Sequence, residues 1–253
     1  GKQMIKSANG HIAVSENEIP HFMEYGVSSE EISIIPNGVN TDDFLADDVL
    51  AFKKKLDLEG ISFILFLGRL NVIKGPDLLL KAFCNIKNNL HDFHLVFAGP
   101  DDGMLSDLKR MVDECQLNDR IHFIGYLGGA DKSNAYHAAD LLVIPSRQEA
   151  MSIVVLEAGI SGTPVLLTDQ CGFNVIEEIN GGSVVQASVE GLEMGLIEIL
   201  SDRDRLKSMG SNLKQYTNEN FTWDFIIGKY LILFDKILDV TGPKNIYGSS
   251  FEK

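Results

Sequence analysis

The sequence predicts an α/β protein built on a doubly wound, parallel, six-stranded sheet with helices on both faces, a Rossmann-like arrangement. Two observations indicate this fold. Short, almost continuously apolar runs alternate with helical segments, and polar or glycine-rich loops directly follow those runs. Parallel strands need long crossover connections, which are usually helices. The expected strands are residues 62–67, 94–98, 121–124, 141–144, 164–167 and 183–185.

The expected helices follow from start and stop residues and from apolar periodicity. Pro76 suits a first helical turn, where its missing N–H costs nothing. Apolar side chains recur on one side of residues 104–115, and Gly162 follows the mostly apolar helix at 153–160. The remaining helices are expected at residues 50–56, 76–88, 132–138, 189–200, 203–215 and 223–238.

The first residues of the chain hold too few elements for a core of their own, because two strands and a helix bury too little apolar surface. These elements are strands at 11–15 and 32–35 and a helix at 18–25, capped by Asn17 and ended by Gly26. We therefore expect a remnant of a larger amino-terminal domain at residues 1–36, a ligand-binding domain at 37–240 and a disordered tail at 241–253.

The composition disfavours several classes of function. A net charge of −14 argues against a nucleic-acid partner, since phosphate backbones bind basic surfaces. The sequence shows neither an apolar run of membrane-spanning length nor a signal peptide, which favours a cytoplasmic location. Cys84, Cys115 and Cys171 are widely spaced and form no C-x-x-C pair, so buried free thiols are expected rather than a disulfide or a metal site.

Two glutamates follow the strand at 141–144. Glu149 lies in the loop and Glu157 lies in the next helix, where an unpaired carboxylate is costly. Ionised carboxylates accept hydrogen bonds, so both residues suit the hydroxyls of a sugar or ribose. The backbone N–H groups around Met151 and Ser152, at the start of that helix, would face the same crevice. The alternative, with Glu149 as a helix cap and Glu157 half exposed, is equally compatible with the spacing.

A second loop, after the strand at 62–67, carries positive charge. Gly68 allows the backbone to approach a ligand closely, and Arg69 and Lys74 together suit a diphosphate. The alternative is a pair of solvated cations. Tyr126 lies in the glycine-rich loop at 125–129 and could contact a flat base, although an ordinary turn explains that loop equally well. We expect Arg69, Lys74, Glu149 and Glu157 to converge on one hollow.

These motifs occur in an order that resembles the carboxy-terminal, donor-binding domain of a group 1 (family 4, retaining) GT-B glycosyltransferase. The matching pieces span most of the chain. They are H-I-A-V-S, I-I-P-N-G-V-N, G-R-L-x3-K-G, A-G-P-D-D-G, F-I-G-Y-L, A-D-L-L-V-I-P-S, E-x7-E, G-T-P-V and F-T-W. Several motifs in sequence make this match far more specific than E-x7-E alone.

The resemblance implies a role for each candidate residue. Arg69 and Lys74 would hold the diphosphate of a nucleotide sugar such as a UDP- or GDP-sugar, Glu157 would accept the ribose hydroxyls, and Glu149 would contact the transferred sugar. Glu149, Arg69 and Lys74 are thus the candidate catalytic residues. The candidate donor-binding residues are Gly68, Arg69, Lys74, Tyr126, Met151, Ser152 and Glu157.

The family also implies the remaining partners. They are a glycan or lipid-linked acceptor bound through the amino-terminal domain, no required metal or other cofactor, transfer with retention, and a place in polysaccharide or glycolipid synthesis. A full-length protein could associate peripherally with a membrane. We expect this polypeptide to bind the donor but to transfer poorly alone, because one wall of the cleft is missing.

One departure bears on the sugar. Ala150-Met151-Ser152 stands where family members commonly have Gly-Phe-Gly, which places side chains near the expected sugar position. Two other functions stay open at this point. One is a non-catalytic nucleotide-binding module that uses the same loops. The other is a glycoside hydrolase, which requires two glutamates that face one bond.

Overall fold

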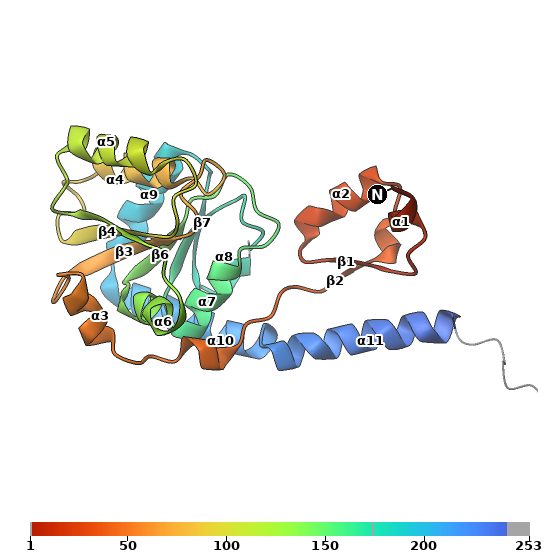
Figure 1. Cartoon of the computed structure of the whole chain (residues 1–253). Helices are drawn as coiled ribbons and strands as arrows, with labels where there is room; N and C mark the ends of the chain where they lie inside the picture. The colour runs from red at the N-terminus through yellow and green to blue at the C-terminus, as the bar shows by residue number, and fades with distance from the viewer. Residues whose placement is uncertain (1, 174, 242–253) are drawn as a thin grey trace, which may run out of the picture.

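The computed structural model describes residues 2–173 and 175–241 (Figure 1). Its main domain contains a six-stranded, all-parallel sheet with the order β5-β4-β3-β6-β7-β8, which confirms the predicted α/β fold. The strands are β3 (Ser62–Leu67), β4 (Phe93–Ala98), β5 (Ile121–Gly125), β6 (Leu141–Ile144), β7 (Val165–Thr168) and β8 (Gly182–Val185).

The strand order reverses at the centre of the sheet. The chain proceeds outward from β3 to β4 and β5, then returns to place β6 on the other side of β3. Ile64 of β3 lies opposite Leu141 of β6 in this parallel pair. Crevices outside the carboxyl ends of the strands at such a reversal are the usual ligand sites of open α/β sheets. The topology therefore predicts a ligand site at the loops that follow β3 and β6.

Helices cover both faces of this sheet (Figure 1). Along β3, Ile64 and Phe66 join a core with α4, α5 and α9, whereas Phe63 and Leu65 join a core with α3, α6 and α7. This alternation is the two-residue period of a strand buried on both faces. The helices are α3 (Val49–Lys55), α4 (Pro76–Asn85), α5 (Leu105–Cys115), α6 (Gly129–Ala138), α7 (Ile153–Ser161), α8 (Val175–Glu178), α9 (Val189–Leu200) and α10 (Arg203–Asn220).

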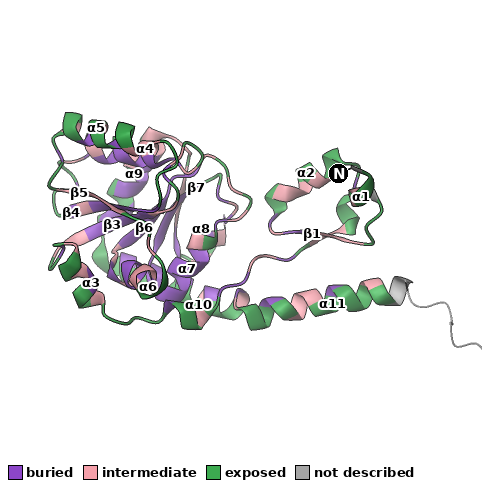
Figure 2. Cartoon of the chain, in the orientation of Figure 1, coloured by how far each residue is buried: buried purple, intermediate pink, exposed green. Residues whose placement is uncertain are grey.

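The amino-terminal residues form a small separate unit beside the long helix α11 (Trp223–Thr241). Its strands β1 and β2 pair in parallel, and Ile35 packs with Ile226 and Leu233 of α11. Much of α11 is exposed (Figure 2). The elements of this unit and of the following linker are α1 (Lys2–Lys6), β1 (His11–Ala13), η1 (Glu16–Glu18), α2 (Ile19–Glu24), η2 (Ser29–Glu31), β2 (Ile32–Ile34) and η3 (Thr41–Phe44).

Some sequence-based expectations differ from the structure. Asn17 lies inside η1 and does not cap α2, whose N-cap is Glu18 without a side-chain cap bond. The helix α10 ends at Asn220, beyond the expected residue 215, and α1 and α8 were not expected. The domain boundaries stay predictions, and the tail from residue 242 onward lies outside the described residues.

The expectation of three free thiols is wrong for two of the cysteines. Cys84 of α4 and Cys115 of α5 form a disulfide, with Cα atoms 6.0 Å apart. The reason is tertiary, because α4 and α5 pack side by side on one face of the sheet and bring distant residues together. Cys171 is a buried free thiol, as expected, and burial raises its pKa to about 11.

Candidate functional site

The loops after β3 and β6 meet at the reversal of the strand order. The Lys74 ammonium lies 2.9 Å from Glu149 Oε1, and the Glu149 side chain is only 7% exposed. The Ser146 hydroxyl donates a hydrogen bond to the same oxygen. A buried carboxylate requires such partners, since desolvation otherwise disfavours its charge. Two predicted site residues from distant loops therefore contact each other.

Arg147, in the loop after β6, forms hydrogen bonds to the loop after β3. Its backbone N–H donates to the Ile73 carbonyl at 2.7 Å, and Nη1 donates to the Val72 carbonyl at 2.6 Å. Its guanidinium also binds both carboxylate oxygens of Asp77, at 2.9 and 2.7 Å. Burial alone would raise the pKa of Asp77, but the hydrogen bonds and charge of Arg147 hold that pKa below its ordinary value.

The same junction depends on a glycine. Gly75 precedes α4 with φ at 68°, and a Cβ there would lie 2.1 Å from the Pro145 carbonyl oxygen. The loops can approach this closely only without a side chain. Sequence reasoning missed Arg147, Asp77 and Gly75 as a unit. The one available signal was an arginine in the loop after a predicted strand, but its partners lie far away in the chain.

The amino-terminal end of α7 lies in the same loop region. Ser152 is the N-cap residue, is 1% exposed, and its hydroxyl has no hydrogen-bond partner within the described residues. The first N–H groups of a helix also lack partners inside the helix. A buried free hydroxyl beside such N–H groups suits an oxygen-rich anion such as phosphate. Met151 precedes this position and is partly buried.

Glu157 has partners that the sequence analysis did not name. Its Oε1 lies 2.6 Å from the Lys132 ammonium, and its Oε2 accepts a 2.6 Å hydrogen bond from the Tyr136 hydroxyl. Burial, and then the charge of Glu157, raises the pKa of Tyr136 well above its ordinary value, so the phenol stays a donor. Lys132 and Tyr136 are four residues apart on α6, and that i,i+4 spacing was the signal that could have found them.

A cavity of about 770 Å³ opens beside Glu157. Tyr126, Lys132, Ile153 and Glu157 all line it. The Tyr126 ring is 77% exposed and therefore available to a ligand. Tyr126 was predicted from a loop and Glu157 from a helix, and the structure brings both residues to one cavity.

Arg69 is not in contact with the Lys74–Glu149 pair. It binds Asp102 at 3.0 Å on the surface, with 60% of its side chain exposed. Such exposed ion pairs contribute only about 0–1 kcal/mol, so a ligand could displace this one at little cost. Gly68, its neighbour, lies at a close crossing of chains, since a Cβ on Gly99 would lie 1.8 Å from the Gly68 carbonyl oxygen.

The expectation of one hollow shared by all four charged residues is therefore wrong. Glu149 lines a second cavity of about 630 Å³, together with Glu16, Gln148 and Asp169. Glu157 lines the first cavity, and each glutamate has its own lysine. The segment between the two carboxylates contributes Ala150 to the cavity of Glu149 and Ile153 to the cavity of Glu157.

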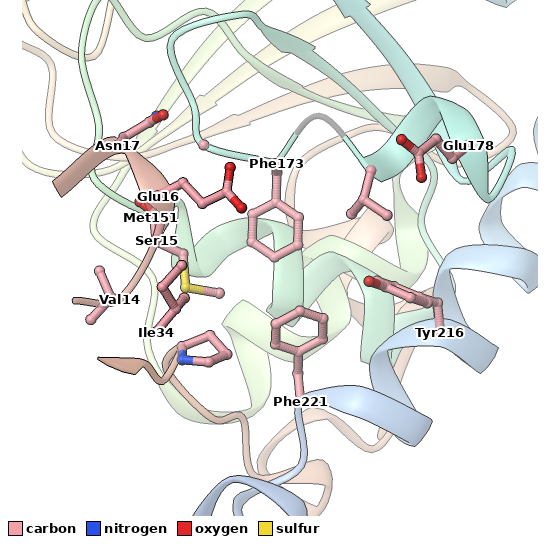
Figure 3. Close-up of a pocket in the computed structure, with 13 residues that line it drawn as sticks. Val14, Ser15, Glu16, Asn17, Ile34, Met151, Phe173, Glu178, Tyr216 and Phe221 are labelled. Carbon is pink, nitrogen blue, oxygen red and sulfur yellow. The ribbon is translucent and has the colours of Figure 1, made fainter. Parts of the chain in front are cut away.

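A third cavity of about 440 Å³ lies between the amino-terminal unit and the main domain (Figure 3). Met151 lines it, whereas Ala150 lines the cavity of Glu149 and Ile153 lines the cavity of Glu157. One short segment thus contributes to all three cavities.

The described residues contain neither a metal-ligand cluster nor a membrane-spanning helix. Among the described residues, no three His, Cys, Asp or Glu side chains are grouped to hold a metal ion. The expectation that no metal is required stays a prediction. Within the same residues, no helix combines the length and the apolar character that a membrane span needs.

Comparison with known proteins identifies the family. A profile described as "Glycosyl transferases group 1" matches residues 49–216. The chain belongs to this family. The matched residues include the loops after β3 and β6, and the match confirms the resemblance that the motifs indicated.

Curated relatives of this group 1 glycosyltransferase chain are longer. An uncharacterised glycosyltransferase of Methanocaldococcus jannaschii is 29% identical over 227 residues, covering 86% of this chain and 57% of that protein. A D-inositol 3-phosphate glycosyltransferase of Nocardia farcinica is 27% identical over 232 residues, covering 88% and 51%. A GDP-mannose-dependent alpha-(1-6)-phosphatidylinositol monomannoside mannosyltransferase of Mycobacterium tuberculosis is 29% identical over 210 residues, covering 78% and 54%. The chain spans about half the length of these relatives.

Solved structures share the fold. Anabaena HepE in complex with UDP superposes with a TM-score of 0.82 at 20% identity, covering 90% of this chain and 64% of that chain. A glycosyltransferase of Rickettsia africae gives a TM-score of 0.80 at 23% identity, covering 96% and 67%. The C-terminal domain of a group 1 glycosyltransferase of Francisella tularensis gives 0.64 at 21%, covering 74% of this chain and all of that domain. These neighbours confirm the expected Rossmann-like α/β fold.

Proposed function

We propose that this chain binds a nucleotide-diphosphate sugar across the amino-terminal end of α7 and takes part in transferring the sugar to an acceptor with retention. The observation that carries the proposal is the Lys74–Glu149 pair at the reversal of strand order. Three residues after Glu149 comes Ser152, whose buried hydroxyl has no hydrogen-bond partner among the described residues. A cation, a helix start and a free hydroxyl suit the diphosphate, while the carboxylate suits sugar hydroxyls.

The three parts of the donor then occupy successive places. The nucleoside enters the cavity of Tyr126 and Glu157, where Glu157 accepts ribose hydroxyls. The diphosphate lies at the backbone of Met151 and Ser152, within reach of Lys74, and Arg69 and Gly68 complete that loop. The sugar lies in the cavity of Glu149.

Charge develops on the diphosphate when its bond to the anomeric carbon breaks. Lys74 and Arg69 would stabilise that charge, which is the kind of interaction that lowers a transition state. Glu149 would orient the sugar through its hydroxyls while the acceptor oxygen forms the new bond on the same face and passes its proton to the departing diphosphate oxygen. Burial of Glu149 keeps bulk water away from one side of the sugar.

Relatives suggest the chemical class of both substrates. One relative is named for GDP-mannose and phosphatidylinositol mannoside, another for inositol 3-phosphate, and one structural neighbour contains UDP. We therefore assign a UDP- or GDP-sugar as donor and a polyol, glycan or glycolipid as acceptor, used in the cytoplasm. Peripheral membrane association of a longer protein would fit a lipid-linked acceptor.

The hydrolase alternative has little support. A glycosidase needs two carboxyl groups that flank one bond. Here Glu149 and Glu157 line different cavities, and each is paired with a separate lysine. A non-catalytic module would bind the same donors but would not turn them over when the chain is supplied with an acceptor domain.

Calorimetry with UDP, GDP and ADP, and with the matching nucleosides, tests the proposal. We expect one of these diphosphates to bind at least about tenfold more tightly than its nucleoside, a difference of about 1.4 kcal/mol. Equal affinity of nucleoside and diphosphate, or binding of none, would remove the donor assignment. Turnover by a protein completed with an acceptor domain then separates the enzyme from the binding module.

A further inference from the structure

The third cavity has no part in the donor assignment, yet it lies where ligands of α/β proteins collect (Figure 3). Ser15 lies two residues after the end of β1, and Pro36 lies two residues after the end of β2. Met151 and Phe173 come from the loops after β6 and β7. Two parallel sheets therefore direct the carboxyl ends of their strands toward one space, which is the position where such sheets bind ligands.

One side of this cavity is a packed aromatic wall. The Phe173 and Phe221 rings lie 5.5 Å apart and tilted, and the Tyr216 ring meets Phe221 edge-on at 5.7 Å. Phe173 and Phe221 are only 4% and 8% exposed, so the wall is fixed by its neighbours. Such a wall offers a rigid apolar surface for the flat C–H face of a sugar ring.

The polar side chains that line the cavity are the carboxylates of Glu16 and Glu178, the amide of Asn17 and the hydroxyls of Ser15 and Tyr216. The carboxylates of Glu16 and Glu178 approach from opposite sides in Figure 3, and the Tyr216 hydroxyl lies below Glu178. Burial raises the pKa of Tyr216, and the charge of Glu178 adds to this effect. No lysine, arginine or histidine occurs among the described residues that line the cavity. Hydroxyl groups can donate to these carboxylates, whereas a phosphate would meet like charge.

The third cavity also adjoins the proposed place of the donor sugar. Glu16 and Asn17 line both this cavity and the cavity of Glu149. Met151 lies two residues after Glu149 in the same loop. A ring bound here would therefore lie next to the sugar that is to be transferred.

We propose that this cavity binds the acceptor through a hydroxyl-bearing ring that carries no phosphate or carboxylate. The ring packs on Phe173 and Met151, and its hydroxyls donate to Glu16 and Glu178. This inference rests on the proposed function, since a donor must occupy the neighbouring cavity. It adds a selection rule, namely that the acceptor ring at this point is uncharged.

The test uses the chain with its methionine methyl groups labelled with carbon-13, in the presence of UDP or whichever nucleotide diphosphate binds. Methyl α-glucoside and glucose 6-phosphate are the probes, and the Met151 methyl signal, assigned with Met151→Leu, reports on this cavity. We expect a saturable shift with the glucoside and an affinity lower by about tenfold or more for the phosphate.

Charge reversal separates local from global effects. Glu178→Lys should abolish or reverse the preference for the uncharged probe. Glu24→Lys changes the net charge equally at an exposed position of α2 that lines none of the three cavities, so it should leave the preference unchanged. Either variant behaving like the other would overturn the selection rule.

Three further outcomes are decisive. A Met151 signal that responds to neither probe while nucleotide diphosphate still binds would overturn the acceptor cavity and leave the donor assignment intact. If the unmodified chain binds no nucleotide diphosphate at all, that result would instead count against the proposed function. Equal affinities for the two probes would also overturn the proposal.

Discussion

Lys74 and Glu149 form an ion pair of 2.9 Å that joins the loop after β3 to the loop after β6. These two strands are neighbours in the sheet although they are far apart in the chain. The pair therefore exists only because the strand order reverses between them. It places one cation and one buried carboxylate beside the start of α7, where the proposed donor would lie.

The Arg147–Asp77 contact should determine how well this site is preformed. We expect Arg147→Ala to destabilise the fold by about 1–3 kcal/mol, because it removes charge-assisted hydrogen bonds and leaves Asp77 half buried and unpaired. Nucleotide diphosphate affinity should fall as well, since the loop of Lys74 is released. Urea unfolding and calorimetry measure the two effects. Arg110→Ala, which breaks an exposed pair with Asp107, is the control and should cost less than about 1 kcal/mol.

The same contact predicts a pH dependence. The folded-state pKa of Asp77 is below its ordinary value of 3.8, so the unfolded chain binds this proton more readily. The stabilisation is therefore complete above pH 3.8 and is lost as the pH falls through the lower folded-state pKa. Asp77→Asn should be less stable than the unmodified chain near neutral pH, and this difference should shrink with acidification below that value. A difference that grows with acidification would contradict the assignment.

The Ser152 hydroxyl should contribute to ligand binding but not to the stability of the ligand-free chain. Its buried hydroxyl has no partner among the described residues, and such a group costs roughly 1–3 kcal/mol. Ser152→Ala should thus leave the ligand-free chain as stable or more stable in thermal unfolding. It should weaken diphosphate binding in calorimetry, because the hydroxyl is proposed to contact phosphate. A large loss of stability without ligand would show that the hydroxyl has a structural partner.

Glu157 should recognise ribose rather than phosphate. Glu157→Gln removes the charge that faces Lys132 and Tyr136, and we expect it to weaken UDP binding by about 1–3 kcal/mol. Binding of 2′,3′-dideoxy-UDP should change little, because that ligand lacks the hydroxyls. Exposed Glu190 of α9 provides a matched Glu→Gln control. Equal losses for both nucleotides would assign Glu157 a structural role.

The sequence predicted the sheet well because its strands are continuous apolar runs. The strands at 62–67 and 141–144 have the expected bounds, since both are buried on two faces and end at Gly68 and Pro145. Helix ends were less predictable. The helix α10 continues through polar residues to Asn220, where packing rather than pattern determines its end.

The site was predictable residue by residue but not as an arrangement. Loop position after a strand identified Lys74 and Glu149, and the structure places them in contact. The partners of Arg69 and Glu157 depend on tertiary packing. Nothing in the sequence connected Asp102 with Arg69, and the i,i+4 spacing of Lys132 and Tyr136 indicated a shared helix face without indicating Glu157 as its partner. The disulfide between Cys84 and Cys115 was missed for the same reason.

Calorimetry on Lys74→Ala that compares UDP with uridine, or the corresponding pair for GDP or ADP, tests the proposed diphosphate site most directly. Lys109→Ala, at an exposed position of α5, is the control. We expect Lys74→Ala to weaken diphosphate binding by about tenfold or more and nucleoside binding by less than about twofold, while Lys109→Ala changes neither. Equal losses for the nucleoside and its diphosphate on Lys74→Ala would rule out the role of Lys74 at the diphosphate.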